Sequence, residues 1–362
     1  MSERATGPVL VIGGAGFIGC NLVDRLVCNG WRVRVYDNLS RAGVRHNIDW
    51  IRGRHGDRVQ VVIGDVRDRD AVREACADAV AVYHLAAQVA VTTSLCDPIY
   101  DFEVNLRGTL EVLEALRALE QPPPLVFTST NKVYGQLAGL ELHELESRWE
   151  PRDVWLRGRG IDETRPLSFC SPYGCSKGGA DQYVLDYAQT FGIPAAVFRM
   201  SCIYGPHQFG TEDQGWVAHF LIRALSEEPI TIYGDGKQVR DILFVDDLVD
   251  ALLNAWQKMN VLRGQAFNIG GGPQRAVSLR EVVGMIGRLR DGDVPKTRFA
   301  EWRPGDQRYY VSSIESFSKL TGWAPKVDVE AGVERLYRWL LAQSRPSGVS
   351  GLSGHERRDV AQ

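Results

Sequence analysis

A glycine-rich segment near the N-terminus, GGAGFIG, constrains the fold of this 362-residue chain more than any other feature. Residues 8–14 are nearly all apolar, which is typical of a strand buried on both faces, and residues 17–30 carry apolar side chains at helical spacing. Gly13, Gly16 and Gly19 between them would let the backbone approach a pyrophosphate, and the start of the helix would offer free N–H groups to the anion. The segment predicts a dinucleotide site at the start of an α/β fold, although a loop that only needs glycine dihedrals could carry the same residues.

Strand-like and helix-like stretches alternate through the first half of the chain. The apolar runs that predict strands lie at residues 31–37, 59–65, 80–87 and 124–130, and helical spacing is found at residues 68–79 and 105–120. Repeated β-then-α units imply parallel strands joined by right-handed crossovers. We therefore predict an α/β fold with a Rossmann-like, doubly wound parallel sheet.

The regular alternation of predicted strands and helices ends in the second half of the chain, where short strand-like and helical segments are separated by polar and aromatic loops. This pattern predicts a second, smaller α/β substrate lobe that is woven from several stretches. We place the cofactor-binding domain at residues 1–200 and 238–270, and the substrate lobe at residues 201–237 and 271–343. Residues 344–362 are rich in Ser, Gly and charged side chains, which predicts a flexible, solvated tail.

The composition excludes several classes of protein. The 45 acidic and 42 basic side chains give a net charge of −3, so no overall basic field would attract DNA or RNA. The apolar runs fall far short of the ~20 residues that span a bilayer, and the first residues lack the apolar core of a signal peptide. The seven cysteines form no CxxC pair, which predicts neither a zinc site nor a disulfide framework. We expect a cytoplasmic protein with no bound metal, no nucleic-acid partner and no membrane anchor.

An acidic residue follows the glycine loop at the distance that a dinucleotide site requires. Asp37 closes the second predicted strand, 18 positions after Gly19, where a carboxylate would bind the adenosine ribose. A 2′-phosphate would meet this carboxylate, so Asp37 favours NAD over NADP as the cofactor. Arg41 lies close enough in the sequence to leave NADP open.

A tyrosine and a lysine stand four residues apart in YGCSK, at the start of a predicted helix over residues 173–191. This spacing places Tyr173 and Lys177 on one face of the helix. A free tyrosine has a pKa of about 10, and a nearby ammonium group and a cationic nicotinamide would each favour the phenolate. The pair is therefore a candidate general base with its tuning residue, although a Tyr and a Lys are also common on an ordinary amphipathic helix.

Three hydroxyl side chains end a predicted parallel strand at the edge where such sheets bind ligands. Thr128, Ser129 and Thr130 could hold a substrate hydroxyl against Tyr173, or could simply cap the turn that follows the strand. Their presence strengthens the interpretation of Tyr173 and Lys177 as a catalytic pair.

Taken together, the motifs resemble one family. GGAGFIG, HLAAQV, STNKVYG, YGCSK and the pair Asp65 and Val66 resemble the extended short-chain dehydrogenase/reductase (NAD-dependent epimerase/dehydratase) family of nucleotide-sugar enzymes, over residues 9–341. The resemblance implies NAD as the cofactor and a catalytic set of Thr130, Tyr173 and Lys177. The cofactor-binding residues expected from the glycine loop, Asp37 and the resemblance are Gly13, Gly16, Phe17, Ile18, Gly19, Asp37, Asn38, Ser40, Arg41, Asp65, Val66, Leu85, Ala86, Ala87, Gln88 and Lys177.

The two residues after Thr130 indicate which reaction of the family to expect. All members begin by oxidising a sugar hydroxyl, with hydride passing to NAD. Dehydratases and decarboxylases of the family typically carry acidic residues in the segment where this chain has Asn131 and Lys132. Elimination needs an acid to protonate the leaving hydroxyl. The resemblance therefore implies an epimerase, which oxidises the sugar, turns the ketone and returns the hydride to its other face.

The second lobe narrows the expected substrate. SCIYGPHQFGTEDQGWV, GDGKQVRD and WRPGDQRYYVS resemble the family's epimerases that invert C2 of a CDP-linked dideoxyhexose through a 2-keto sugar. The alternatives are a 4-epimerase of a UDP- or CDP-sugar, then a decarboxylase or a 4,6-dehydratase. Outside the enzymes, a catalytically silent NAD-binding regulator or scaffold is an alternative against which the intact catalytic set argues. Relatives are often dimers or tetramers, which implies a homo-oligomer.

Several residues of the second lobe are candidates for binding the nucleotide sugar. The guanidinium forks of Arg240 and Arg303 match the oxygens of a diphosphate, and Trp216 and Tyr233 offer stacking surfaces. Cys202 stands where relatives often carry Asn or Ser, so it either faces the sugar or fills buried space. The full candidate set is Thr130, Asn131, Lys132, Ser201, Cys202, Gln208, Gln214, Trp216, Tyr233, Arg240, Arg303 and Asp306. The long polar connection over residues 136–170 could be a surface loop or could cover the substrate.

Overall fold

The computed structural model of the protein describes residues 7–137, 139–303 and 305–344. Its centre is a seven-stranded sheet in the order β12-β8-β5-β4-β1-β2-β3, in which every neighbouring pair is parallel. The strands are β1 (Val9–Ile12), β2 (Val33–Asp37), β3 (Val59–Ile63), β4 (Ala81–His84), β5 (Leu125–Thr130), β8 (Ala195–Met200) and β12 (Gln265–Ile269). The predicted Rossmann-like sheet is confirmed.

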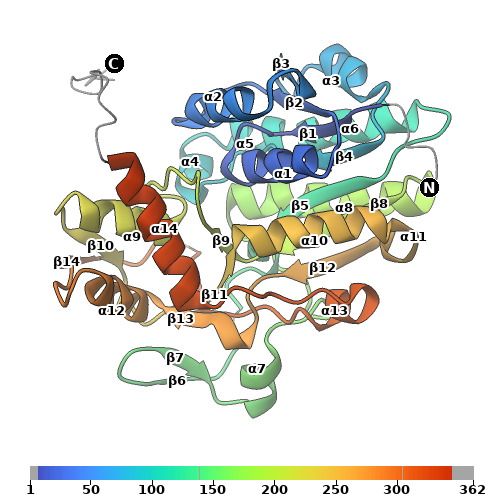
Figure 1. The fold of residues 1–362 in the computed structure, drawn as a ribbon. Coiled ribbons are helices and arrows are strands. Elements are labelled where there is room, and N and C mark those ends of the chain that lie inside the picture. The colour runs from blue at the N-terminus through green and yellow to red at the C-terminus, as the bar shows by residue number, and fades with distance from the viewer. Residues whose placement is uncertain (1–6, 138, 304, 345–362) are drawn as a thin grey trace.

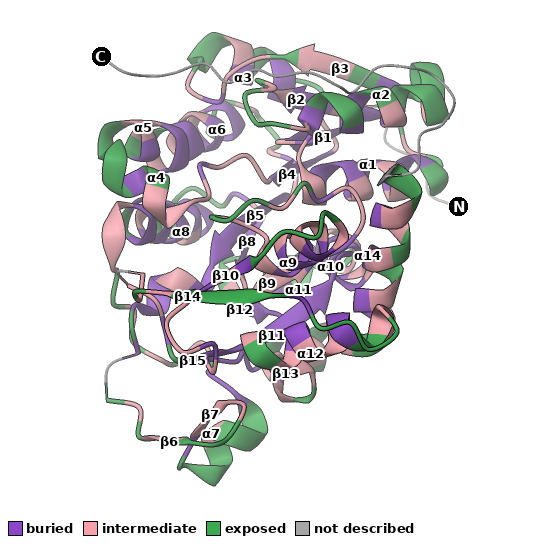
Figure 2. Cartoon of the chain, turned by 90° about the vertical axis from the view of Figure 1, so that its left-hand side faces the viewer, coloured by how far each residue is buried: buried purple, intermediate pink, exposed green. Residues whose placement is uncertain are grey.

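Helices cover both faces of this sheet (Figure 1). On one face lie α1 (Phe17–Cys28), α2 (Val44–His55) and α10 (Val245–Gln257), and on the other α3 (Arg69–Cys76), α6 (Gly108–Arg117) and α8 (Ser171–Thr190). Each helix buries its apolar stripe, so the residues between the sheet and each helix layer form two separate apolar cores. Figure 2 shows the result, with largely buried strands between helices whose outer faces are exposed.

The helix predicted over residues 105–120 begins earlier and is built from several pieces. It follows α4 (Val91–Cys96) and α5 (Pro98–Phe102), and its first turn, η2 (Glu103–Arg107), has π-helical hydrogen bonds before α6 continues. Asp97 begins α5 by accepting a hydrogen bond from the N–H of Tyr100 at 2.9 Å. This broken segment packs against α8, and the site depends on that contact.

The smaller lobe contains two small sheets and is woven from distant stretches of the chain. One sheet joins β11 (Val239–Phe244) to β9 (Cys202–Tyr204), β13 (Ala276–Ser278) and β15 (Tyr309–Tyr310), and the other pairs β10 (Ile230–Tyr233) with β14 (Thr297–Ala300). Its helices are α9 (Trp216–Leu225), α12 (Leu279–Leu289) and α14 (Val329–Ser344), whereas α11 (Met259–Leu262) and α13 (Glu315–Thr321) pack against strands of the large sheet.

The predicted cofactor-domain segment of residues 238–270 contributes strands to two different sheets. β12 closes the large sheet as the assignment of residues 238–270 requires, whereas β11, from the same stretch, lies in a sheet of the smaller lobe. The division into two domains therefore stays a prediction. The predicted tail lies outside the described residues from position 345 onward.

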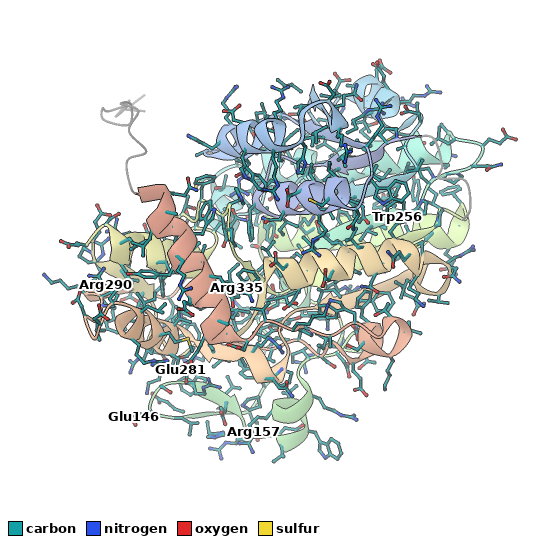
Figure 3. The ribbon with its side chains drawn as sticks, in the orientation of Figure 1. Glu146, Arg157, Trp256, Glu281, Arg290 and Arg335 are labelled. Carbon is teal, nitrogen blue, oxygen red and sulfur yellow. The ribbon has the colours of Figure 1, made fainter. Side chains whose placement is uncertain are left out.

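The connection over residues 136–170 is a docked hairpin and helix. It contains β6 (Leu142–Glu144), β7 (Trp149–Pro151) and α7 (Val154–Arg159). Arg148 Nε donates to Glu281 Oε1 at 2.7 Å, and Figure 3 shows Glu281 on the part of α12 that faces the hairpin. Trp149 Nε1 donates to Asp235 at 2.9 Å. None of its described residues lines the three cavities of the site described below, which favours the interpretation of this segment as a surface connection; whether it covers a bound substrate stays a prediction.

Within the described ranges, no helix is both long enough and apolar enough to cross a bilayer.

Candidate active site

The order of the strands creates a crevice at the carboxyl end of the sheet. From β1 the chain moves to β2 and β3 on one side, and it then crosses to β4 on the other side of β1. Doubly wound sheets bind ligands at such a switch point. The loops after β1 and β4 meet there, with the N–H groups of Leu85 and Ala86 donating to the Ile12 oxygen at 2.8 and 3.0 Å. Gly13 has a φ of +83°, and a Cβ there would lie 2.5 Å from Ala86 N, so this junction requires glycine.

The first of three connected cavities, called here the glycine-loop cavity, lies over this junction. Asp37 at the end of β2 faces it, and its carboxylate accepts hydrogen bonds from the N–H groups of Ala15 at 3.0 Å and Leu39 at 2.8 Å. Burial raises the pKa of Asp37, while these hydrogen bonds and the charge of Arg41 oppose the rise. The predicted residues that line this cavity are Gly13, Gly16, Asp37, Asn38, Ser40, Arg41, Val66, Leu85, Ala86 and Ala87.

A central cavity continues from the glycine loop to the ends of β5 and β8. It shares Gly13, Gly16 and Arg41 with the glycine-loop cavity. Gly16, the residue before α1, offers no side-chain acceptor, so the first N–H groups of this helix stay available for an anion. The predicted residues that this cavity adds are Phe17, Ile18, Gly19, Thr130, Tyr173, Lys177, Ser201, Cys202, Gln208, Gln214 and Trp216.

The catalytic candidates meet where β5 lies against α8. Lys177 Nζ donates to the backbone oxygen of Thr128 at 2.7 Å and lies 4.3 Å from the centre of the Phe127 ring. Burial lowers the pKa of Lys177 to about 7, against the opposing charges of Asp181 and Asp101. Lys177 is thus able to change its protonation state near neutral pH.

Tyr173 lies in the same buried corner. Burial raises its pKa to about 12, and Asp101 adds to the rise, while a hydrogen bond with Thr130 and the charge of Arg41 lower it. The sequence predicts an ammonium group as the tuner of Tyr173, whereas Thr130 and Arg41 are the groups that lower its pKa in the structure.

Thr130 is held from two sides. Its Oγ1 accepts from the N–H of Lys132 at 3.2 Å and donates to Asn131 Oδ1 at 3.4 Å. Asn131 Nδ2 in turn donates to Oε1 of Gln307, a fully buried residue of the smaller lobe, at 3.3 Å. The hydroxyl that faces Tyr173 is therefore fixed by residues of both lobes.

The third cavity, called here the lobe cavity, lies between Tyr173 and the smaller lobe. Arg240 Nη2 lies 2.7 Å from Asp306 Oδ1, and Lys132 Nζ lies 3.5 Å from the same oxygen. Arg303 stacks on Tyr233, with its guanidinium carbon 3.9 Å from the ring centre. The predicted residues that line it are Thr130, Asn131, Lys132, Tyr173, Cys202, Gln214, Trp216, Tyr233, Arg240, Arg303 and Asp306.

Four predicted residues are engaged within the protein. Asp65 accepts from Arg67 and Asn38, and Gln88 is bonded to Ala90; neither of them lines the three cavities. Ser201 and Gln208 line the central cavity, but the Ser201 hydroxyl donates to Asp241 and the Gln208 amide donates to the Ile203 oxygen at 3.2 Å. The binding roles of all four stay predictions.

Several residues of the site were not predicted. Val89, Val91 and Leu95 form an apolar wall of the lobe cavity, and Glu212 and Asp213 stand near its arginines. Val89 lies in HLAAQV, and Glu212 and Asp213 lie in SCIYGPHQFGTEDQGWV, so these motifs could have pointed to them. Val91 and Leu95 come from α4, a short helix without a motif, which only the folded topology brings to the site. Ser176, by contrast, lies inside YGCSK and could have been singled out.

One cluster outside the site has the residue types of a metal site. Asp24, Cys28 and His55 place their ligand atoms within 4.8 Å of one another, at the contact between α1 and α2. Asp24 is already paired with Arg54 and His55, each at 2.7 Å. The expectation that the protein binds no metal stays a prediction.

The residues of the glycine-loop and central cavities fit a dinucleotide. The start of α1 can receive a pyrophosphate, and Asp37 stands where it can accept from a ribose hydroxyl. The Ser129 hydroxyl, which lines the central cavity, is buried without a partner within the described chain. An unpaired buried hydroxyl is costly, and a ligand that bonds to it would remove this cost.

Comparison with known proteins agrees with this geometry. Residues 9–270 match the model of the NAD dependent epimerase/dehydratase family. The chain belongs to this family, and its cofactor is NAD, which confirms both predictions.

Individual relatives cover almost the whole chain. It is 40% identical to CDP-paratose 2-epimerase of Salmonella typhi, over 91% of this chain and 98% of the relative. It is 31% identical to dTDP-glucose 4,6-dehydratase 1 of Escherichia coli, over 93% of each chain. Among solved structures, UDP-glucose 4-epimerase of Thermus thermophilus in complex with NAD superposes with a TM-score of 0.77 at 33% identity, over 92% of this chain and 99% of that one.

Proposed function

We propose that this enzyme is a nucleotide-sugar epimerase that inverts C2 of a CDP-linked dideoxyhexose. The observation that carries the proposal is the position of Tyr173 and Thr130, which line both the central cavity and the lobe cavity. A general base with a neighbouring hydroxyl at this junction would face the cofactor on one side and a sugar on the other. The 40% identity with a CDP-paratose 2-epimerase supports the choice of carbon and base.

In the proposed reaction the catalytic residues move one proton twice. NAD held by the residues of the glycine-loop and central cavities would supply the hydride acceptor for the oxidation and the hydride donor for the reduction. Tyr173 takes the proton of the C2 hydroxyl as the 2-keto sugar forms, and gives it back when the ketone is reduced on its other face. Thr130 holds the reacting oxygen against Tyr173, and Lys177 supplies the positive charge that favours the phenolate.

The lobe cavity is suited to a diphosphate. Lys132, Arg240 and Arg303 bring three cationic side chains into it, and Arg240 is almost fully buried. Charge-assisted hydrogen bonds from such groups are about twice as strong as those between neutral groups. We assign the diphosphate of the substrate to these residues, and the sugar to the space between them and Tyr173.

The carboxylates of the lobe cavity argue against elimination. Among its described lining residues these are Glu212, Asp213 and Asp306. Burial raises the pKa of Asp306, but Arg240 and Lys132 outweigh this and hold it below its usual value. A hydrogen bond from Tyr233 lowers the pKa of Glu212, and Asp213 pairs with Arg303 at 3.3 Å. Asp306 and Glu212 therefore stay ionised at neutral pH, and an ionised carboxylate cannot protonate a leaving hydroxyl.

Product analysis tests the proposal. The enzyme is incubated with NAD and either CDP-paratose or UDP-glucose, and the sugar is followed by NMR, with Tyr173→Phe as the inactive control. We expect inversion at C2 of CDP-paratose and little turnover of UDP-glucose. Inversion at C4 of UDP-glucose would replace the proposal by a 4-epimerase, and loss of water or carbon dioxide would replace it by a dehydratase or decarboxylase.

Two further proposals concern the state of the enzyme. A homo-oligomer is supported by the exposed apolar side chains Leu95, Ile99 and Phe102 on α4 and α5, and light scattering would give the number of subunits. A cytoplasmic location is supported by the seven cysteines, which are all free thiols.

A further inference from the structure

A carboxylate that the proposed reaction does not use lies buried behind the catalytic helix. Asp101 on α5 is 0% exposed. Ser176 Oγ donates to its Oδ2 at 2.5 Å, and Asn105 Nδ2 donates to its Oδ1 at 3.1 Å. Ser176 directly precedes Lys177 and lies one turn after Tyr173. Asp101 is therefore tied to α8 at a point between the two catalytic side chains.

The same polar cluster reaches the loop after β4. Asn105 Oδ1 accepts from the N–H of Gln88 at 2.9 Å, and Asn105 Nδ2 donates to the Gln88 oxygen at 3.0 Å. On α4, Ser94 Oγ accepts from the N–H of Tyr173 at 3.2 Å. The start of α8 is thus bonded to α4, α5 and η2, and through Asn105 it is linked to the cofactor-side loop. Asp101 is the carboxylate of this network.

The two carboxylates that act on Lys177 differ in their hydrogen-bond partners. Asp181 and Asp101 are the two carboxylates that act on the Lys177 ammonium. Asp181 forms a bidentate ion pair with Arg199, with both N–O distances at 2.9 Å, so a guanidinium balances its charge. The partners of Asp101 are a hydroxyl and an amide, which are neutral.

The other titratable groups that face Tyr173 and Lys177 are His84 and Arg41, and neither carries a negative charge. His84 on β4 also lies near Lys177, but burial lowers its pKa to about 3, so it is neutral. Arg41 faces Tyr173 from the loop after β2 and is a cation. Asp101 is therefore the one carboxylate without an arginine partner among the described groups that act on Tyr173 and Lys177. Burial raises the pKa of Asp101, while Ser176, the charge of Lys177 and Asn105 oppose the rise.

We propose that Asp101 is a positioning residue of this site: through Ser176 it holds the start of α8, and with it Tyr173 and Lys177, in place, and it contributes a buried carboxylate to their surroundings. The proposal rests on the epimerase function proposed above and adds to it a residue that touches neither substrate nor cofactor.

Removing this charge has a defined effect on the pH profile. Burial lowers the pKa of Lys177 and Asp101 opposes it, while burial raises the pKa of Tyr173 and Asp101 adds to the rise. Loss of the carboxylate charge lowers both values. In the active form of the proposed enzyme the two side chains hold one proton between them, so the acid limb of the profile, where a second proton binds, moves to lower pH.

The test is the pH dependence of kcat/KM with CDP-paratose for the wild type and three variants. Asp101→Asn keeps the shape of the side chain, and we expect its acid limb at lower pH than that of the wild type. Ser176→Ala keeps the charge but breaks the link to α8, and we expect turnover to fall by up to about 100-fold with the limb unmoved. Glu103→Gln is the matched control, because Glu103 pairs with Arg107 at the surface of η2. It should leave the profile unchanged.

An acid limb of Asp101→Asn at the wild-type position would overturn the proposal, and so would an equal shift in Glu103→Gln. Circular dichroism verifies folding; if Asp101→Asn does not fold, Asp101→Ser, which leaves room for water beside Ser176, carries the same test. Wild-type enzyme that inverts no nucleotide sugar at any pH would refute the proposed function instead, so the two failures are distinguishable.

Discussion

Lys177 Nζ donates a hydrogen bond to the backbone oxygen of Thr128 at 2.7 Å. This contact joins α8 to β5 two residues before Thr130, so it fixes the helical half of the catalytic set against the strand half. Both halves lie at the carboxyl end of the sheet, where the central cavity opens into the lobe cavity. The acid–base chemistry of the enzyme depends on this junction.

Loss of the Tyr173 hydroxyl should abolish turnover while the cofactor still binds. Tyr173→Phe removes the proton acceptor but leaves the ring in its buried position. General acid–base groups contribute about 10²–10⁴-fold in rate, so we expect kcat to fall by at least about 100-fold. Steady-state kinetics together with an NAD titration measure both quantities, and wild-type turnover in the variant would refute Tyr173 as the base.

Asp37 should contribute to NAD binding both directly and through the glycine loop. Asp37→Ala removes the carboxylate that faces the cavity and the acceptor for the N–H groups of Ala15 and Leu39. A hydrogen bond to a charged group contributes about 1.5–3 kcal/mol, so the Kd for NAD should rise at least about tenfold. Asp37→Asn retains one acceptor and should lose less. Isothermal titration calorimetry of the purified enzyme with NAD measures this Kd. An unchanged Kd in folded Asp37→Ala would contradict the ribose assignment.

Two helical glycines should respond oppositely to alanine. A Cβ on Gly19 in α1 would lie 2.3 Å from Gly13 O, so Gly19→Ala must displace the phosphate loop. A Cβ on Gly53 in α2 meets nothing within 4 Å. We expect Gly19→Ala to lower both the melting temperature and the affinity for NAD. Gly53→Ala should stabilise the protein by up to about 1 kcal/mol, because Ala is the better helix former. Equal melting temperatures for the two variants would contradict the close approach at Gly19.

His84 should make stability depend on pH. Burial lowers its pKa to about 3, and its ring nitrogen is paired with Thr109 at 3.1 Å. An unfolded histidine has a pKa of about 6.5, so at lower pH the unfolded chain binds a proton that the folded protein does not bind. The stabilising contribution is thus complete above about pH 6.5 and is lost progressively as the pH falls. Denaturant unfolding at several pH values should show a weaker acid dependence for His84→Gln, and an identical dependence would contradict the assignment.

The sequence was most informative where local chemistry dictates structure. Gly13 and Asp37 were predicted because a phosphate loop needs glycine at a strand-to-helix turn and a carboxylate at the end of the next strand. Tyr173 and Lys177 were predicted because helical spacing alone places them together. The π-helical turn at η2 was missed, since its apolar spacing does not differ from that of an α-helix.

Residues that act through long-range contacts could not be predicted. Gln307 reaches Asn131 across 176 positions, and Asp101 reaches Ser176 across 75. Neither pair has a spacing or a motif that links its members. Arg240 and Asp306 were both named for the substrate, but their ion pair, which keeps the carboxylate ionised, appears only in the fold.

The fate of the hydrogen at C2 tests the central claim most directly. CDP-paratose is incubated with the enzyme and NAD in deuterated water until the two epimers reach equilibrium, and the sugar is examined by NMR. Direct return of the hydride predicts inversion at C2 with no solvent deuterium at that carbon. Substantial deuterium at C2 would show that the hydrogen exchanges with solvent, and would contradict an epimerisation in which Tyr173 moves only the hydroxyl proton.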